Sequence, residues 1–100
     1  MAKLEIHPEV FLEIDEARAW YDERVPDLGK SLLREVEAAI QTIKRYPTRW
    51  AVFDGDARRV ILHRFPYSLV YALVDHSIHI VALAHFSRRP GYWKHRLAEM

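Results

Sequence analysis

The residues with the clearest chemistry in this 100-residue sequence are the cationic and aromatic side chains of its last quarter. No acidic residue occurs between Asp75 and Glu99. The permanent cations of the same stretch are Arg88, Arg89, Lys94 and Arg96. The first 27 residues have the opposite balance, with eight acids against three cations. A basic segment of this kind attracts an acidic partner, which can be a nucleic acid or an acidic protein segment.

Other groups of reactive residues are weaker candidates. Among six histidines, the close pair His76 and His79 has no acidic residue nearby to complete a metal site, so we interpret both as ordinary surface or strand residues. A triad of Ser68, His85 and Asp75 would need a nucleophile elbow, which the sequence lacks. Three glycines and no cysteine leave no phosphate loop, disulfide or thiolate nucleophile. We therefore predict no metal and no cofactor.

Two helices and a sheet must position these residues. Apolar residues recur at three- and four-residue spacing after Pro8, which predicts a helix from Pro8 to about Arg24. Its acidic residues fall mainly on the other face, and we interpret that face as solvated. Asp27 is the predicted N-cap of a second helix, whose apolar stripe ends before Pro47.

Extended runs are predicted over residues 50–53, 58–65, 67–74 and 78–85, the last two joined by a tight turn. Alternation over residues 3–7 predicts a further strand at the N-terminal edge. The pattern β-α-α-β-β-β indicates an α+β fold, with a two-helix antiparallel hairpin packed on one face of an antiparallel β-sheet. We expect one domain over residues 1–100.

Alternation within 58–65 assigns its side chains to two faces of the predicted sheet. One face receives Arg59, Ile61, His63 and Phe65. The other face receives Arg58, Val60, Leu62 and Arg64. Arginines at a sheet edge can simply discourage aggregation, or they can contact a partner, and the pattern alone leaves both interpretations open.

Several motifs in a fixed order carry a resemblance to a known family. A first strand motif reads Arg64-Phe-Pro-Tyr-Ser-Leu-Val-Tyr71, the strand over 78–85 follows, and the ending reads Arg88-Arg-Pro-x-Tyr-Trp93. Upstream, Ala17-x-x-Trp-Tyr21 and Tyr46-Pro47 are similar to a two-helix opening. In this order the motifs resemble the RelE/ParE superfamily of bacterial toxins, and its ParE-like branch in particular.

The resemblance implies the toxin component of a type II toxin–antitoxin system, which a cognate antitoxin protein neutralises by wrapping it with an extended or helical segment. ParE-like members poison DNA gyrase, so we expect growth arrest through gyrase binding. The residues implied to contact the target or the antitoxin are Arg58, Arg64, Arg88, Arg89, Tyr92 and Trp93.

The alternative is a ribosome-dependent mRNA endoribonuclease, because RelE-like relatives cut mRNA in the ribosomal A site. His85, Arg88 and Tyr92 would then be the catalytic residues. Ser68 stands where RelE has a second catalytic arginine, and a serine cannot supply that charge. A third class, a non-toxic module that binds RNA or protein, also fits a basic ending with aromatic residues.

The sequence contains no segment suited to a membrane. Its longest apolar run, Leu69–Val74, is far shorter than the roughly 18 residues that a membrane span needs. The first residues lack the apolar region of a secretory signal. We therefore expect a cytoplasmic protein with no membrane partner.

Overall fold

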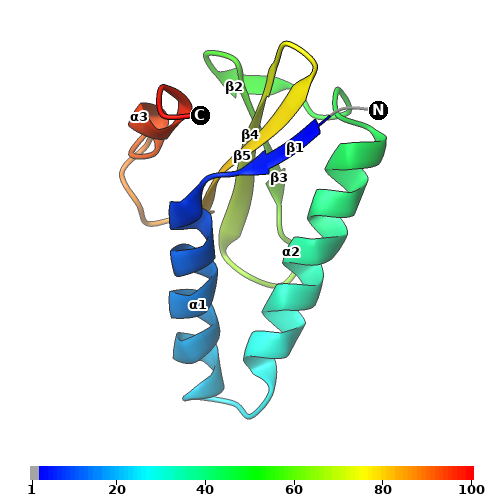
Figure 1. Ribbon diagram of the computed structural model, residues 1–100. Helices are drawn as coiled ribbons and strands as arrows, with labels where there is room; N and C mark the ends of the chain where they lie inside the picture. The colour runs from blue at the N-terminus through cyan, green and yellow to red at the C-terminus, as the bar shows by residue number, and fades with distance from the viewer. Residues whose placement is uncertain (1–2) are drawn as a thin grey trace.

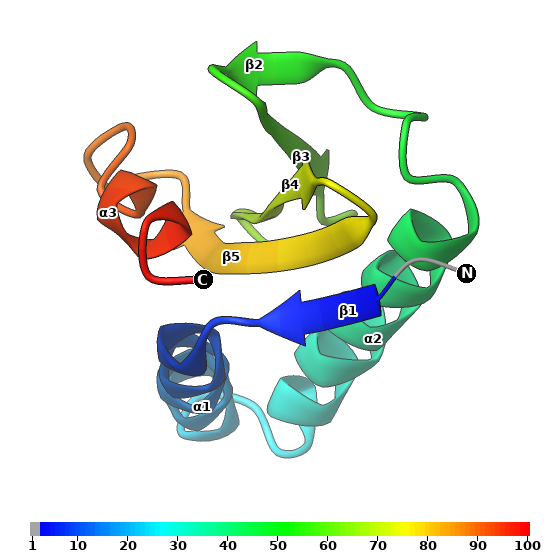
Figure 2. The same cartoon turned by 45° about the horizontal axis from the view of Figure 1, so that its top comes forward.

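The computed structural model describes residues 3–100 of the chain. In chain order the elements are β1 (Lys3–Ile6), α1 (Pro8–Asp22), α2 (Leu28–Arg45), β2 (Val52–Asp54), β3 (Ala57–Ile61), β4 (Tyr67–Val74), β5 (Ser77–His85) and α3 (Lys94–Leu97). The strands form one sheet in the order β1-β5-β4-β3-β2. Figure 1 shows α1 and α2 as an antiparallel hairpin, and Figure 2 shows α3 beside the end of β5. The expected α+β fold is confirmed.

The N-terminal edge strand is present, but it runs parallel to its neighbour. β1 pairs with β5 in parallel, with Leu4 opposite Ile78, whereas the other strand pairs are antiparallel. The sheet is therefore mixed, and not wholly antiparallel as the sequence predicted. Alternation along one strand shows which side chains share a face, but it carries no information about the direction of the neighbouring strand.

Helix α1 begins where the sequence predicts. Pro8 is its first residue, and His7 Nδ1 accepts a hydrogen bond from the backbone N–H of Glu9 at 3.1 Å. The helix ends at Asp22 rather than near Arg24. Among residues 3–100, no helix is long and apolar enough to cross a membrane.

Asp27 is the N-cap residue of α2, as predicted, but the side chain that accepts a hydrogen bond at the start of the helix is Asp22. Asp27 has a φ of 66° and its side chain makes no cap hydrogen bond, whereas Asp22 Oδ1 accepts a hydrogen bond from the N–H of Gly29 at 2.7 Å. A Cβ atom at position 29 would lie 2.7 Å from the Asp22 carboxylate and 2.8 Å from the Arg18 carbonyl oxygen. This close approach of the two helices therefore requires glycine.

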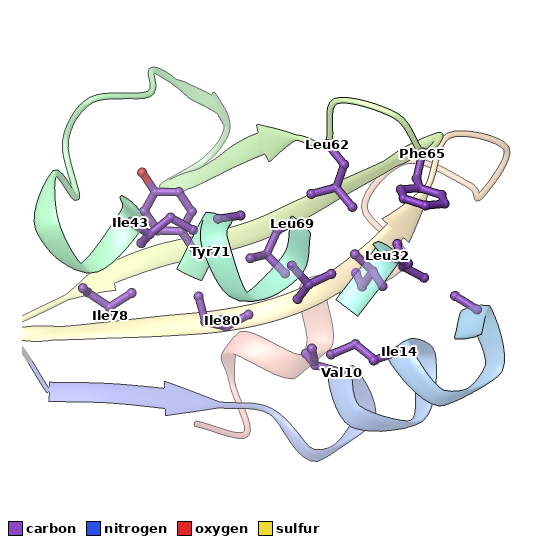
Figure 3. Packing of buried hydrophobic residues seen from close by; sticks show 14 residues of the cluster. Val10, Ile14, Leu32, Ile43, Leu62, Phe65, Leu69, Tyr71, Ile78 and Ile80 are labelled. Atoms are coloured by element: carbon purple, nitrogen blue, oxygen red, sulfur yellow. The ribbon is translucent and has the colours of Figure 1, made fainter. Parts of the chain in front are cut away.

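The main core lies between the helix hairpin and the sheet, as Figure 3 shows. Helix α1 contributes Val10, Ile14 and Ala17, and α2 contributes Leu32, Val36, Ala39 and Ile43. The facing residues of β4 and β5 are Leu69, Tyr71, Ile78, Ile80 and Leu83. The predicted stripe of α2 is thus confirmed, because its buried members recur at the period of the helix. The stripe of α1 was predicted to include Phe11 and Trp20 and is confirmed only in part, because these two side chains are 53% and 50% exposed.

The strand predicted over 58–65 ends early, and the predicted face assignment fails beyond that point. Glu35 Oε1 on α2 accepts hydrogen bonds from the two backbone N–H groups that follow Leu62, at 2.7 and 3.2 Å. The chain turns there, and both Leu62 and Phe65 are buried in the main core. Strict alternation would have placed these two residues on opposite faces.

A bulge in β5 directs two neighbouring residues to the face of the sheet opposite the helices. The register shifts after the pair Val70–Ala82, which leaves Val81 without an opposite residue. Val81 and Ala82 are both buried in a second cluster, with Ala57, Val70 and Trp93. This second cluster holds the segment after β5, residues 86–97, against the sheet; we call that segment the tail.

Candidate partner-binding groove

The face of the sheet opposite the helices carries a cavity of about 470 Å³, which we call the groove. It lies between the β2–β3 hairpin, the ends of β4 and β5, and the tail. Its lining residues are Phe53, Asp54, Arg59, Ile61, Ser68, Val70, Ala84, His85, Phe86, Arg88, Arg89, Pro90, Gly91, Tyr92 and Trp93. The volume lies within the roughly 300–1,000 Å³ range of ligand-binding cavities.

Three exposed arginines give the groove its charge. The Arg59 guanidinium carbon lies 4.3 Å from the ring centre of Phe53, and that of Arg88 lies 3.8 Å from the ring centre of Tyr92. Within residues 3–100, neither of these arginines nor Arg89 forms an ion pair. The groove therefore presents positive charge beside aromatic rings, an arrangement suited to an acidic or aromatic partner.

Two of the six predicted contact residues lie away from the groove. Arg58 donates hydrogen bonds to the carbonyl oxygens of Thr48 and Trp50 in the loop after α2. Arg64 forms an ion pair with Glu35 of α2, at 3.3 Å between Nε and Oε2. These two arginines, which the resemblance implied as contact residues, therefore lie outside the groove, whereas Arg59 lines it.

Trp93 lines the floor of the groove but is not free to act as an exposed anchor. Only 3% of its surface is exposed, and its ring centre lies 6.0 Å from that of Phe53. A buried tryptophan of this kind contributes to the stability of the fold through the apolar area that it removes from water. Trp93, which the resemblance implied as a contact residue, is therefore buried in the second cluster.

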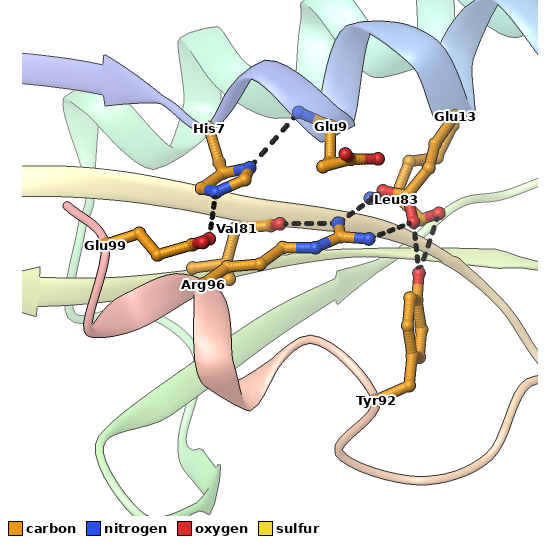
Figure 4. Close-up of polar contacts among 8 residues, drawn as sticks. All are labelled: His7, Glu9, Glu13, Val81, Leu83, Tyr92, Arg96 and Glu99. Atoms are coloured by element: carbon orange, nitrogen blue, oxygen red, sulfur yellow. Dashed lines mark hydrogen bonds and ion pairs between the residues drawn. The ribbon is translucent and has the colours of Figure 1, made fainter.

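A network of buried polar groups joins the tail to α1; we call Glu13, Tyr92 and Arg96 the clasp (Figure 4). Arg96 Nη1 and Nη2 donate to the two carboxylate oxygens of Glu13 at 2.9 and 3.1 Å. The Tyr92 hydroxyl donates to Glu13 Oε2 at 2.6 Å. Glu13 also accepts from the Leu83 N–H at 3.0 Å, and Arg96 donates to the Val81 carbonyl oxygen at 3.0 Å. The clasp thus supplies hydrogen-bond partners for the backbone groups at the edge of β5 that lie beyond the end of β1.

The clasp also fixes protonation states. Burial raises the pKa of the Tyr92 hydroxyl well above its usual range, and the hydrogen bond to the Glu13 carboxylate raises it further. Burial alone would lower the pKa of Arg96, but the bond to Glu13 more than offsets this and the net shift is upward. Tyr92 therefore stays neutral and Arg96 stays charged at physiological pH.

The three residues implied for RNA cleavage all line the groove, but not all of their reactive groups face it. His85 and Arg88 both line it, and the His85 ring packs edge-on against Tyr67 with 5.0 Å between centres. His85 Nδ1 accepts a hydrogen bond from the Ser87 N–H at 3.0 Å. The Tyr92 ring lines the groove as well, but its hydroxyl is directed to Glu13. Ser68, which lines the groove too, supplies no charge.

The histidine pair considered for metal binding is divided between two environments. His79 is buried, with Nε2 3.1 Å from a carboxylate oxygen of Glu5, whereas His76 lies exposed in the turn before β5. In the part of the chain that the structure describes, no group of three or more histidine, aspartate or glutamate side chains could hold a metal ion.

Sequence reasoning missed the role of Glu13. Helical periodicity grouped Glu13 with the solvated acids of α1, yet its side chain is only 11% exposed because Arg96 and β5 cover it. Its partner is 83 positions away in the sequence, so no local pattern could reveal the pair. Arg59 was assigned to the correct face by alternation, but was not among the residues implied as contacts.

Comparison with known proteins supports the fold. No family model matches the sequence, and no curated protein sequence matches it significantly. A chain in the solved structure of the chromosomal ParDE toxin–antitoxin system from P. aeruginosa is similar, with a TM-score of 0.75. The two chains are 15% identical, and the similarity covers 85% of this chain and 96% of that chain. The chain therefore shares the α+β fold of a chain of this ParDE system, which is the fold class that its sequence predicted.

Proposed function

We propose that this chain is the toxin of a type II toxin–antitoxin pair, that it arrests growth by binding DNA gyrase, and that a cognate antitoxin neutralises it. The fold shared with a chain of the ParDE system supports the toxin assignment. A fold alone does not determine a function, so the groove must carry the mode of action. Its three exposed arginines beside apolar side chains are the observation that carries the proposal.

The groove favours binding over RNA cleavage. Cleavage through a 2′-hydroxyl needs a base, an acid and cations placed at the phosphate. Tyr92 is a poor base because its hydroxyl already donates to Glu13 and its pKa is raised. Ser68 cannot replace a catalytic arginine. His85 and Arg88 remain, which is an incomplete set for general acid–base catalysis.

A neutralising antitoxin would cover the groove with a segment that contains both acidic and apolar side chains. Ile61 and Phe86 are 59% and 58% exposed, and they line the groove together with Arg59 and Arg88. Exposed apolar side chains of this kind anchor an interface, whereas arginines at its rim add salt-sensitive attraction and partner choice.

A supercoiling assay tests the proposed target. The purified protein should inhibit gyrase, and Arg88→Ala should weaken the inhibition about tenfold or more, because an arginine at the centre of an interface is a common hot spot. Arg49→Ala, which changes an exposed arginine away from the groove, is the matched control. Unimpaired supercoiling at saturating protein would contradict gyrase as the target.

Primer extension on translated mRNA tests the alternative. Ribosome-bound mRNA should remain uncut in cells that express the protein. Cuts in the ribosomal A site that disappear with Arg88→Ala or His85→Ala would instead establish the endoribonuclease and overturn the binding mode. Expression without any growth arrest would favour the non-toxic binding module.

Co-expression with the neighbouring reading frame tests the antitoxin. A pull-down should recover a complex at about 0.1 M salt and also at about 1 M salt, where rim charges are screened and apolar anchors persist. Phe86→Ala should weaken the complex mainly at high salt, and Arg89→Ala mainly at low salt. Absence of a complex at every salt concentration would count against the antitoxin.

A further inference from the structure

A second cavity, of about 430 Å³, opens beside α1, and we call it the α1 pocket. Its walls come from the second half of α1, from the turn before β4, and from the end of β5. His85 and Arg88 line both the α1 pocket and the groove, so these two residues separate the cavities. Apart from these two residues, the lining of the α1 pocket has no part in the function proposed above.

Aromatic rings form much of the α1 pocket. Trp20 and Tyr21 lie edge to face with 4.9 Å between ring centres, and Tyr21 and Tyr67 lie 6.4 Å apart. Tyr67 in turn packs edge-on with His85 at 5.0 Å. Half of the Trp20 surface remains exposed. Rings at steep angles present several negative faces to one cavity, and such faces attract cations.

The lining also offers one carboxylate that is free to bind a cation. Glu13 and Glu16 are carboxylates, and Arg88 is the cation of the lining, with its guanidinium stacked on Tyr92. Glu13 is occupied by the clasp, whereas the side chain of Glu16 forms no ion pair or hydrogen bond within residues 3–100. Burial raises the pKa of Tyr67, and the nearby Tyr21, Glu16 and Glu13 raise it further.

We propose that the α1 pocket binds an arginine side chain of a partner polypeptide. A planar guanidinium can stack on an aromatic face and donate forked hydrogen bonds to one carboxylate, here Glu16, whereas an ammonium cannot do both. Trp20 already accepts a guanidinium from within the chain: the carbon of Arg24 lies 3.5 Å from its ring centre. Arg24 does not line the α1 pocket, so the pocket remains open. This proposal does not depend on the toxin assignment.

An NMR titration with the tripeptide acetyl-Gly-Arg-Gly-amide tests the ligand class. The indole N–H signal of Trp20 should shift and saturate, with a dissociation constant in the millimolar range. The same peptide with citrulline, which has the shape of arginine without its charge, should bind about tenfold more weakly. The lysine peptide should also bind more weakly. Equal binding of all three peptides, or tighter binding of free arginine, would overturn the proposal.

Matched variants of α1 test the location. Trp20→Ala should abolish saturation, monitored on Tyr67 signals, and Glu16→Gln should weaken binding about fivefold, through loss of one charged contact. The controls are Phe11→Ala and Asp15→Asn, which make comparable changes at exposed positions of α1 outside the lining. A circular dichroism melt of each variant separates loss of the pocket from loss of the fold. Folded Trp20→Ala protein that still saturates would overturn the proposal.

Discussion

The clasp and the groove both use residues of the tail, but the tail arginine of the clasp is buried and paired, whereas those of the groove are exposed and unpaired. In the clasp, Arg96 is 5% exposed, and its two terminal nitrogens bind both oxygens of Glu13. In the groove, Arg88 and Arg89 are exposed and have no ion pair within residues 3–100. A buried, paired arginine fixes the tail in place, whereas an exposed arginine stays available to a partner.

The difference teaches that a basic tail is not one functional unit. β1 pairs with β5 only as far as Ile80, and the next edge groups of β5 would be unsatisfied without the clasp. Glu13 lies at this edge because α1 follows β1 directly. The cation that reaches Glu13 is structural, and Lys94 pairs with Asp54 at 3.0 Å. Arg88 and Arg89, which precede them in the tail, form no ion pair within residues 3–100.

The largest expected effect on stability is the difference between replacing a buried and an exposed aromatic residue of the tail. Trp93→Ala should lower the free energy of unfolding by about 3–5 kcal/mol, because it removes a buried ring from the second cluster. Phe86→Ala, at an exposed position, should change it by less than about 0.5 kcal/mol. Urea denaturation of both variants makes the comparison. Similar stabilities would mean that Trp93 does not hold the tail.

The next effect concerns the ion pair of the clasp. Arg96→Met should cost about 3 kcal/mol of unfolding free energy, because Glu13 is then buried without its cation. Adding Glu13→Gln should recover part of this loss, since the unpaired charge is gone. Arg89→Met is the control on the exposed side. A double variant that is less stable than the sum of the two single losses would contradict a coupled pair.

A smaller effect comes from the third member of the clasp. Tyr92→Phe should cost about 1 kcal/mol near pH 7, through the loss of one hydrogen bond to a carboxylate. The raised pKa means that folded Tyr92 keeps its proton after unfolded tyrosine ionises at about pH 10. The contribution of Tyr92 to the free energy of unfolding is therefore fully present below about pH 10, and it is lost as the pH rises further. Denaturation at about pH 8 and pH 11 should show a steeper loss for the wild type than for Tyr92→Phe; equal losses would contradict the shift.

The smallest expected effect on stability belongs to the groove. Arg88→Ala should change the free energy of unfolding by less than about 0.5 kcal/mol, because its guanidinium is exposed and stacks only on Tyr92. The same change should markedly weaken binding to a partner, as measured by pull-down with the antitoxin proposed above. If Arg88→Ala instead lost much stability and kept its binding, Arg88 would be a structural residue and not a contact residue of the groove.

Local sequence patterns predicted most of the fold because they depend on neighbours in the chain. The periodicity of Leu32, Val36 and Ile43 predicted α2, and Pro8 and Pro47 marked helix boundaries. Alternation placed Arg59 and Ile61 on one face of β3, and it failed only where a loop replaces the strand. The acid-free ending likewise predicted a basic surface, since composition alone determines its net charge.

The sequence by itself determined the two long helices, the strands, their order and the excess of cations in the tail, but it did not predict α3. Only the tertiary structure decided which cations remain free, because that depends on the acids that distant segments bring to them. The contact of Arg96 with Glu13 spans 83 positions, and Glu35 reaches Arg64 across 29. Burial of Trp93 depends in the same way on the bulge in β5 and on the β2–β3 hairpin. Such contacts arise from packing and register, which no local pattern specifies.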